Sequence, residues 1–193
     1  SAVSPKAGVW FRTDPEASNW LARVSFLRRV LPEFDLPDFD DRTLASIVEE
    51  LCRDWGMSRV EELERQNRTN ALRGRLTRSQ NQRLDLDAPS CLKLPNGRVA
   101  TLTYEHNRPP VLGARIQELF GWTETPRVAQ GRVPILLHLL APNQRPVQIT
   151  DDLRSFWTTT YFQVRKDLRG RYPKHNWPED PLNARPETRP GRG

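Results

Sequence analysis

The sequence has only two cysteines, Cys52 and Cys91, among 193 residues. This excludes a framework of several disulfides and a zinc site with four cysteine ligands, and it is typical of a reducing compartment. No window holds the ~18 uncharged apolar residues that a membrane-spanning helix needs. The first residues also lack the basic and then apolar pattern of a signal peptide. We therefore expect a cytoplasmic protein that does not insert into a membrane.

The motifs of several large enzyme classes are also missing. The sequence has no Walker-type phosphate loop, no Gly-x-Gly-x-x-Gly and no Gly-x-Ser-x-Gly. His138 falls inside an apolar, strand-like run, where a histidine is usually part of the core. Glu105 and His106 could form an acid–base pair, but no nucleophile lies nearby in the sequence. We find no catalytic residues and no metal-ligand cluster, and we expect this chain not to be an enzyme and to bind no cofactor.

Acidic residues are scarce in the second half of the chain. Residues 1–87 hold 14 basic and 15 acidic residues, whereas residues 88–193 hold 16 and 9, a net charge of +7. Only four of the 30 basic residues are lysines, and arginine suits the geometry of phosphate and carboxylate groups. The base composition of the gene could equally explain this arginine excess, but it does not explain the asymmetry. The charge distribution predicts an acidic partner for the C-terminal half.

The first part of the chain is predicted to be a helical block over residues 15–87, after an irregular lead-in over residues 1–14. Asp14 is suited to be a helix N-cap, and a proline follows at the first helical position. Apolar residues then recur at helical spacing in three stretches, and a capping-box pattern marks a short helix between them. These helices are expected over residues 15–31, 41–55, 67–86 and, for the short one, from residue 58.

Residues 88–182 mix strand and helix patterns and form a basic second block. Asn96-Gly97 lies between two strand-like runs, which is a strong signal for a β-hairpin. A second hairpin is predicted from the apolar run at 133–140 and the strand-like residues 147–149. Two hairpins indicate a small antiparallel sheet.

Two helices accompany this predicted sheet. One is expected over residues 112–120, and the other begins after Thr150, taken as its N-cap, and has one apolar stripe that reaches Leu168. Residues 183–193 are polar and rich in proline and arginine, and we expect them to be disordered. The fold class is therefore expected to be α+β, a helical block followed by the small sheet and its two helices.

The last predicted helix carries the strongest candidate binding site. Helical spacing places Arg154, Arg165 and Arg169 along one side of its apolar stripe. Arginines beside aromatic rings suit phosphate contacts combined with base stacking. The spacing therefore predicts a nucleic-acid interface. Further basic and aromatic members of this interface follow the helix at once: Arg171, Tyr172, Lys174, His175 and Trp177.

Two structural interpretations of the same residues stay open. The arginines could cover apolar surface on an ordinary solvated helix face. Tyr172 and Trp177, each followed by a proline, could form a hook that packs the C-terminus onto its own domain.

Several uncommon residue combinations stand out in the sequence. They are Gln117-Glu118-Leu119-Phe120-Gly121, Gly131-Arg132-Val133-Pro134, Leu137-His138-Leu139-Leu140-Ala141-Pro142-Asn143, Asp151-Asp152-Leu153, Phe156-Trp157, and Arg171-Tyr172-Pro173-Lys174-His175 with Trp177-Pro178. With these combinations the chain resembles one known family, the C-terminal domain of the HrpB family of bacterial ATP-dependent helicases. The resemblance covers roughly residues 10–182 and is loosest between residues 65 and 82.

The resemblance implies that this chain is part of a longer DEAH-type helicase that hydrolyses ATP to move on RNA in the bacterial cytoplasm. A first residue Ser1 instead of methionine agrees with a piece cut from a longer chain. ATP and Mg²⁺ would bind in motor domains upstream, so no ATPase residue is assigned here. Related helicases have an OB-like barrel in their C-terminal region, and by analogy the strands could form part of one.

Two functions are then expected for a non-catalytic accessory module of such a helicase. The first is sequence-independent binding of single-stranded nucleic acid, RNA in particular, through the basic half. The alternative is protein docking, which would brace the motor domains or link the helicase to a partner. The family is associated with a penicillin-binding protein of peptidoglycan synthesis, which could be that partner. Residues 34–39 and 172–178, rich in proline and aromatic residues, would then be surface anchors.

Overall fold

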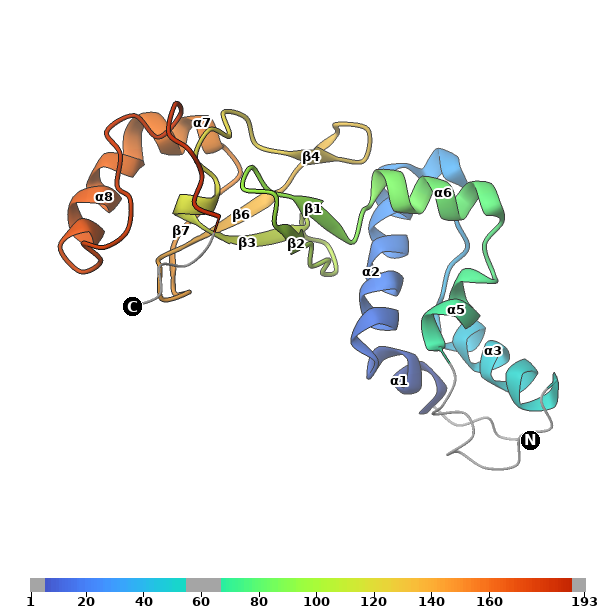
Figure 1. The fold of residues 1–193 in the computed structure, drawn as a ribbon. Coiled ribbons are helices and arrows are strands. Elements are labelled where there is room, and N and C mark those ends of the chain that lie inside the picture. The colour runs from blue at the N-terminus through green and yellow to red at the C-terminus, as the bar shows by residue number, and fades with distance from the viewer. Residues whose placement is uncertain (1–5, 55–66, 189–193) are drawn as a thin grey trace. The chain divides into compact units, whose positions relative to one another are not determined.

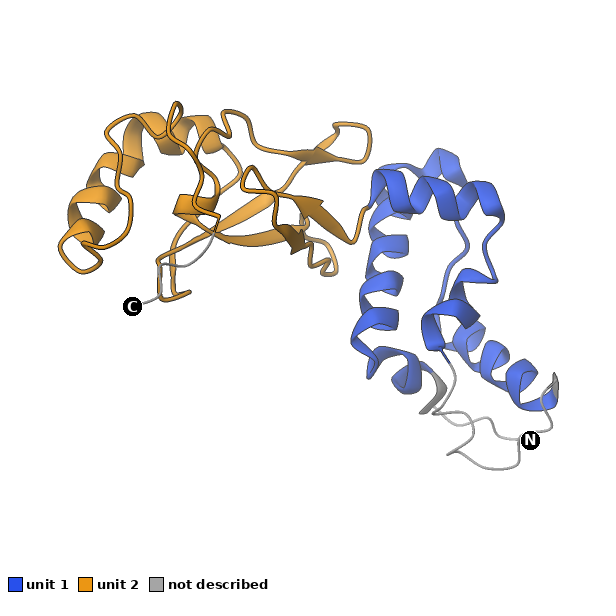
Figure 2. Cartoon of the chain, viewed as in Figure 1, with its two compact units in different colours: residues 1–88 blue, residues 89–193 orange. Residues whose placement is uncertain are grey.

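The computed structural model describes residues 6–54 and 67–188 of the chain (Figure 1). The chain divides after Ala88 into two compact units, unit 1 with residues 1–88 and unit 2 with residues 89–193 (Figure 2). This division lies one residue beyond the end of the predicted helical block. The α+β fold class is confirmed, with the described helices of unit 1 preceding all the described strands.

The described part of unit 1 is helical. The predicted N-cap of the helix α2 (Pro15–Val30) is confirmed. The Asp14 carboxylate accepts a hydrogen bond of 2.8 Å from the Ala17 N–H. The helix expected over residues 67–86 is instead two helices, and a capping box between Thr77 and Gln80 starts the second. The short helix expected from residue 58 lies outside the described residues. The helices are α1 (Lys6–Arg12), α2 (Pro15–Val30), α3 (Asp41–Asp54), α5 (Arg68–Arg73) and α6 (Arg78–Asp87), with a 3₁₀ turn, η1 (Pro32–Phe34), after α2.

Helix α1 corrects the expectation of an irregular lead-in over residues 1–14 for its residues 6–12, while residues 1–5 lie outside the described residues. Contacts with distant residues stabilise this short helix, which no sequence periodicity marks. Phe11 is fully buried, and Arg68 donates a hydrogen bond of 2.6 Å to the Trp10 carbonyl oxygen. The Arg68 guanidinium also lies 4.7 Å from the centre of the Trp10 ring.

The described part of unit 2, residues 89–188, contains three small sheets. Both predicted hairpins are confirmed, as β1 (Cys91–Lys93) with β2 (Val99–Thr101) and as β6 (Leu136–Leu140) with β7 (Pro146–Thr150). A further antiparallel pair joins β4 (Arg127–Val128) to β5 (Val133–Pro134). The largest sheet has the order β3–β6–β7, with β3 (Val111–Arg115) parallel to β6. The expected antiparallel sheet is therefore mixed, and no ring of strands closes into a barrel among the described residues.

Strand β3 replaces the helix expected over residues 112–120. The apolar residues Leu112, Ile116 and Leu119 are spaced as in a helix, but the backbone of residues 111–115 pairs with β6 instead. Only Ile116–Glu118 form a helical turn, the 3₁₀ turn η2. The pairing partner lies more than twenty residues away, so local spacing could not reveal it.

The last helix is present and has the predicted apolar stripe. It consists of α7 (Leu153–Ser155), a π-helical segment η3 (Phe156–Thr160) and α8 (Tyr161–Arg169). Its N-cap is Asp152 and not Thr150, because the Asp152 carboxylate accepts a hydrogen bond of 2.9 Å from the Ser155 N–H. The buried residues of the stripe are Leu153, Phe156, Trp157, Tyr161 and Leu168.

Residues 183–188 are ordered parts of unit 2, which corrects the expectation of disorder from residue 183. The Glu187 N–H donates a hydrogen bond of 2.9 Å to the Gln117 carbonyl oxygen. Just before this segment, the Pro181 carbonyl oxygen accepts a hydrogen bond of 3.0 Å from the Gly121 N–H. Gly121 has a φ of +82°, which favours glycine. The rest of the predicted disordered tail, residues 189–193, lies outside the described residues.

Candidate nucleic-acid interface

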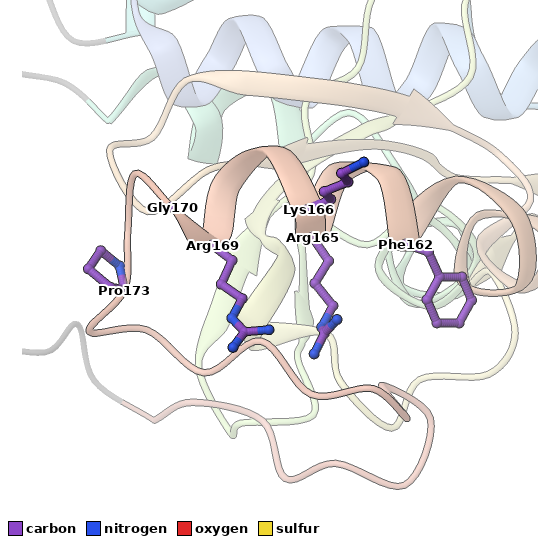
Figure 3. A pocket seen from close by; sticks show the side chains of 6 residues that line it. All are labelled: Phe162, Arg165, Lys166, Arg169, Gly170 and Pro173. Carbon is purple, nitrogen blue, oxygen red and sulfur yellow. The ribbon is translucent and has the colours of Figure 1, made fainter.

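The C-terminal end of α8 and the loop after it form an open groove of about 690 Å³, here called the α8 groove. Figure 3 shows Phe162 at one end and Pro173 at the other, with the side chains of Arg165 and Arg169 between them on the same side of α8. Three of the lining residues are cationic and none is acidic. The lining residues are Phe162, Arg165, Lys166, Arg169, Gly170 and Pro173.

Helix geometry explains why these side chains line one groove. Residues three and seven apart share a face of an α-helix, and this relation joins Phe162 to Arg165 and Arg169, whereas the side chain of the lining residue Lys166 points to the other side of α8 in Figure 3. The acid of the helix, Asp167, accepts a hydrogen bond of 2.9 Å from the Gln163 amide one turn earlier. Neither Asp167 nor Gln163 lines the groove, so the acidic charge lies on another face.

Four exposed cations of α8 and its loop have no ion-pair or hydrogen-bond partner for their side chains among the described residues. They are Lys166, Arg169, Arg171 and Lys174. Such cations can neutralise an external anion without first breaking an internal contact. Lys166 and Arg169 lie in the last turn of α8, where they also stabilise the helix dipole.

The other two arginines of the predicted site are engaged. Arg154 forms an ion pair with Glu124. The Arg165 side chain is only 19 % exposed, donates a hydrogen bond of 2.7 Å to the Trp177 carbonyl oxygen and lies 3.4 Å from the Glu179 carboxylate. The structure therefore does not bring Arg154, Arg165 and Arg169 together as three equivalent free cations.

Trp177 is part of the packed interior and not a free ring. It is 7 % exposed, and its indole N–H donates a hydrogen bond of 2.9 Å to the Tyr172 carbonyl oxygen. The Tyr161 hydroxyl donates one of 2.8 Å to the Pro178 carbonyl oxygen, and burial raises the pKa of Tyr161 to about 12, so that the hydroxyl keeps its proton. These contacts fit the hook interpretation for Trp177, whose ring is not available to stack on a base.

Tyr172 and His175 occupy intermediate positions. Both are half-buried, and their rings lie 6.3 Å apart in an edge-to-face arrangement. The His175 Nδ1 atom is 3.4 Å from the Glu187 carboxylate, which ties the ring to the end of the described chain. His175 therefore has a structural partner, while Tyr172 is partly exposed.

Four lining residues of the α8 groove were not among the predicted site residues, namely Phe162, Lys166, Gly170 and Pro173. Phe162 is half exposed although it is large and apolar. The signal was available, since Phe162, Lys166 and Arg169 follow one another at spacings of four and three residues. The aromatic residues predicted for the site were instead Tyr172 and Trp177, which are closer in the sequence to the densest cluster of basic residues.

A second charged cluster lies inside unit 2. Glu118 is 4 % exposed and accepts hydrogen bonds from the Arg98 guanidinium at 2.7 and 3.0 Å and from the Arg115 N–H at 2.9 Å. Burial acts to raise the pKa of Glu118, but these hydrogen bonds outweigh it and hold the pKa below its usual value. This cluster fastens the β1–β2 hairpin to the turn after β3.

Other kinds of site are not found in the part of the chain that the structure describes. No group of three or more histidine, cysteine, aspartate or glutamate side chains is placed to hold a metal ion there. None of the helices described there is both long and apolar enough to cross a bilayer. The half-buried His138 lies on the central strand β6.

Comparisons with known proteins agree with the resemblance seen in the sequence. Residues 51–181 match the family described as HrpB, ATP-dependent helicase C-terminal. The chain is 42 % identical over 180 residues to the ATP-dependent RNA helicase HrpB of Escherichia coli (strain K12), an alignment that covers 89 % of this chain and 22 % of that protein.

Solved structures of similar proteins give the same result. The fold matches a crystal structure of the E. coli DExH-box NTPase HrpB with a TM-score of 0.84 and 42 % identity, over 91 % of this chain and 22 % of the other. It matches a crystal structure of the Escherichia coli DEAH/RHA helicase HrpB with a TM-score of 0.70 and 40 % identity, over 85 % and 21 %. The chain thus spans about a fifth of the length of these relatives. This chain belongs to the HrpB family, in which it corresponds to the C-terminal domain of an ATP-dependent helicase.

Proposed function

We propose that this chain is a non-catalytic accessory module that adds sequence-independent binding of single-stranded nucleic acid, RNA in particular, to a cytoplasmic helicase. ATP and Mg²⁺ would act in the motor domains of that helicase. The observation that carries the proposal is the set of four exposed cations at the end of α8 and in the loop after it that have no side-chain partner within the described ranges, namely Lys166, Arg169, Arg171 and Lys174.

The chemistry of phosphate binding supports this proposal. Nucleic-acid affinity without sequence preference comes from cations that replace the counterions of the phosphate backbone. The α8 groove is lined by three cations and no acid, and residues 88–193 carry a net charge of +7. An acidic ligand would therefore be attracted to unit 2 and would meet free cations at the groove.

The test is a fluorescence-anisotropy titration of a labelled single-stranded RNA at several salt concentrations. For single strands the logarithm of the binding constant falls with the logarithm of salt by about 0.7 per phosphate contact. Four contacts predict a slope of about −3. The variant K166E/R169E should bind more weakly and show a slope closer to zero.

A matched control is available in the same unit. Lys93 in β1 and Arg145 in the β6–β7 turn are exposed and lie outside the groove lining. The variant K93E/R145E changes the net charge by the same amount as K166E/R169E. If both variants weaken binding equally, general charge and not the groove holds the RNA. If the unaltered chain does not bind RNA even at low salt, the proposal is wrong.

The docking alternative loses support from the packing of its supposed anchors. The Phe39 ring packs edge-to-face on Trp20 with ring centres 5.2 Å apart, and the Arg83 guanidinium lies 4.5 Å from the centre of the Phe34 ring. Trp177 is buried, as described above. Because these rings have contacts inside their own units, nucleic-acid binding is the function that the described surfaces support best.

A further inference from the structure

Phe162 is the most exposed aromatic side chain of the last helix. It is 50 % exposed, whereas Phe156, Trp157 and Tyr161 on the same helix are at most 2 % exposed. The Phe162 ring contacts the Tyr161 ring edge-to-face, with ring centres 5.8 Å apart. Its position is thus supported from one side, while the remaining surface faces the open α8 groove (Figure 3).

The neighbours of this ring are cations. Arg165 lies between Phe162 and Arg169 along the groove in Figure 3, and its hydrogen bond to the Trp177 carbonyl oxygen holds the guanidinium in place. Phe162 and Arg169 are seven residues apart, which is about 10 Å along a helix axis. A strand whose backbone follows these cations would bring a base to the ring.

We propose that Phe162 is the base-stacking residue of this interface and that it makes the module select single strands over duplexes. The inference rests on the proposed function, since it needs nucleic acid in the α8 groove. Phosphate contacts alone attract both forms of nucleic acid. A ring can stack only on a base that is splayed out of its helix, so Phe162 adds affinity for single strands and none for a blunt duplex.

The experiment compares a single-stranded RNA with a blunt duplex of the same sequence, both titrated with the 193-residue chain. F162A should lower the affinity for the single strand by roughly 5- to 150-fold, the range for the loss of one base–aromatic contact. Its affinity for the duplex and the salt slope should not change. F162Y keeps a stacking ring and should retain the affinity for the single strand.

The matched control is I149A in β7, because Ile149 is also a large apolar residue, 51 % exposed, in the same unit. Circular dichroism of each variant checks that the fold is kept. The stacking role is supported if F162A, but not I149A, reduces the single-strand preference. It is overturned if F162A changes both affinities equally, or neither, while K166E/R169E still weakens RNA binding. The proposed function itself fails separately, if the unaltered chain binds neither form.

Discussion

The guanidinium of Arg165 and the carbonyl oxygen of Trp177 are joined by a hydrogen bond of 2.7 Å across twelve residues. This bond ties α8 to the segment that returns along it. Together with the Tyr161–Pro178 bond it fixes the hook that buries Trp177. The cation that sequence spacing presented as a ligand-binding group is therefore also a support of the fold.

Replacing Arg165 should cost stability, whereas replacing its neighbour should not. R165Q removes a charged donor to a half-buried carbonyl and should lower the free energy of unfolding by about 1.5–3 kcal/mol. K166Q changes an exposed side chain without a described partner and should stay within about 0.5 kcal/mol. Urea denaturation followed by tryptophan fluorescence measures both. Equal losses of unfolding free energy in R165Q and K166Q would mean that the Arg165–Trp177 hydrogen bond contributes nothing to stability.

Trp177 should matter for stability and not for RNA binding. W177F keeps most of the ring but leaves the Tyr172 carbonyl without its indole donor, a loss of about 1 kcal/mol. W177A also empties the space that the ring fills and should cost about 3–5 kcal/mol. The RNA affinity of folded W177F should equal that of the unaltered chain. A large loss of affinity in W177F with unchanged stability would show that the Trp177 side chain contacts the RNA after all.

The Glu118 cluster should make unit 2 sensitive to acid. The pKa of Glu118 is lowered in the folded chain, so its contribution to stability is fully present above the unfolded value of about 4.3. This contribution is lost as the pH falls through the lower folded pKa. The buried Arg115 guanidinium lies 3.5 Å from the Glu118 carboxylate. E118Q should remove this part of the acid dependence and destabilise the chain at pH 7 by about 3–5 kcal/mol, because Arg115 stays buried without its counterion. Denaturation midpoints between pH 2 and 7 measure both effects, and an unchanged acid dependence in E118Q would contradict the assignment.

Arg23 should stabilise unit 1 alone. It is buried in α2 and donates hydrogen bonds of 2.6 Å to the Ala88 carbonyl oxygen and 2.8 Å to the Asp85 carboxylate. R23M should destabilise unit 1 by about 1.5–3 kcal/mol, while Asp85 keeps its partner Arg73. Residue-resolved amide exchange should become faster in residues 6–54 and 67–88 and should stay unchanged in residues 89–188 of unit 2.

A suitable control for R23M is R42M, which alters an exposed residue of α3. It should leave amide exchange in both units as it is in the unaltered chain. Faster exchange across both units in R23M would mean that they unfold as one.

The sequence predicted the elements whose pattern is local. The apolar stripe from Leu153 to Leu168 and the Asn96-Gly97 hairpin depend on neighbours in the chain, and both are present. Strand β3 could not be predicted, because Leu112 and Ile116 have helical spacing and only the parallel pairing with β6 makes residues 111–115 a strand. Helix α1 was missed for the same reason, since its contacts come from Arg68.

The candidate site was predicted in part. Charge and helical spacing led to Arg169, Arg171 and Lys174, which are exposed and unpartnered in the described part of the chain. The internal hydrogen bonds of Arg165 and Trp177 depend on a loop that folds back onto α8. No sequence periodicity predicts such a loop. Phe162 was not predicted, because Tyr172 and Trp177 are the aromatic residues that follow the basic end of the helix in the sequence.

The anchoring of Glu187 has a consequence for how this module is divided from its helicase. The family match covers residues 51–181. Residue 51 lies inside α3 (Asp41–Asp54). Glu187, whose N–H donates a hydrogen bond to the Gln117 carbonyl oxygen, lies after the last matched residue. A fragment cut at the limits of the family match would remove the buried Leu44 and Ile47 of α3 and lose the Glu187 contacts. The stretch that matches the family is thus shorter than the stretch whose contacts hold the described fold together.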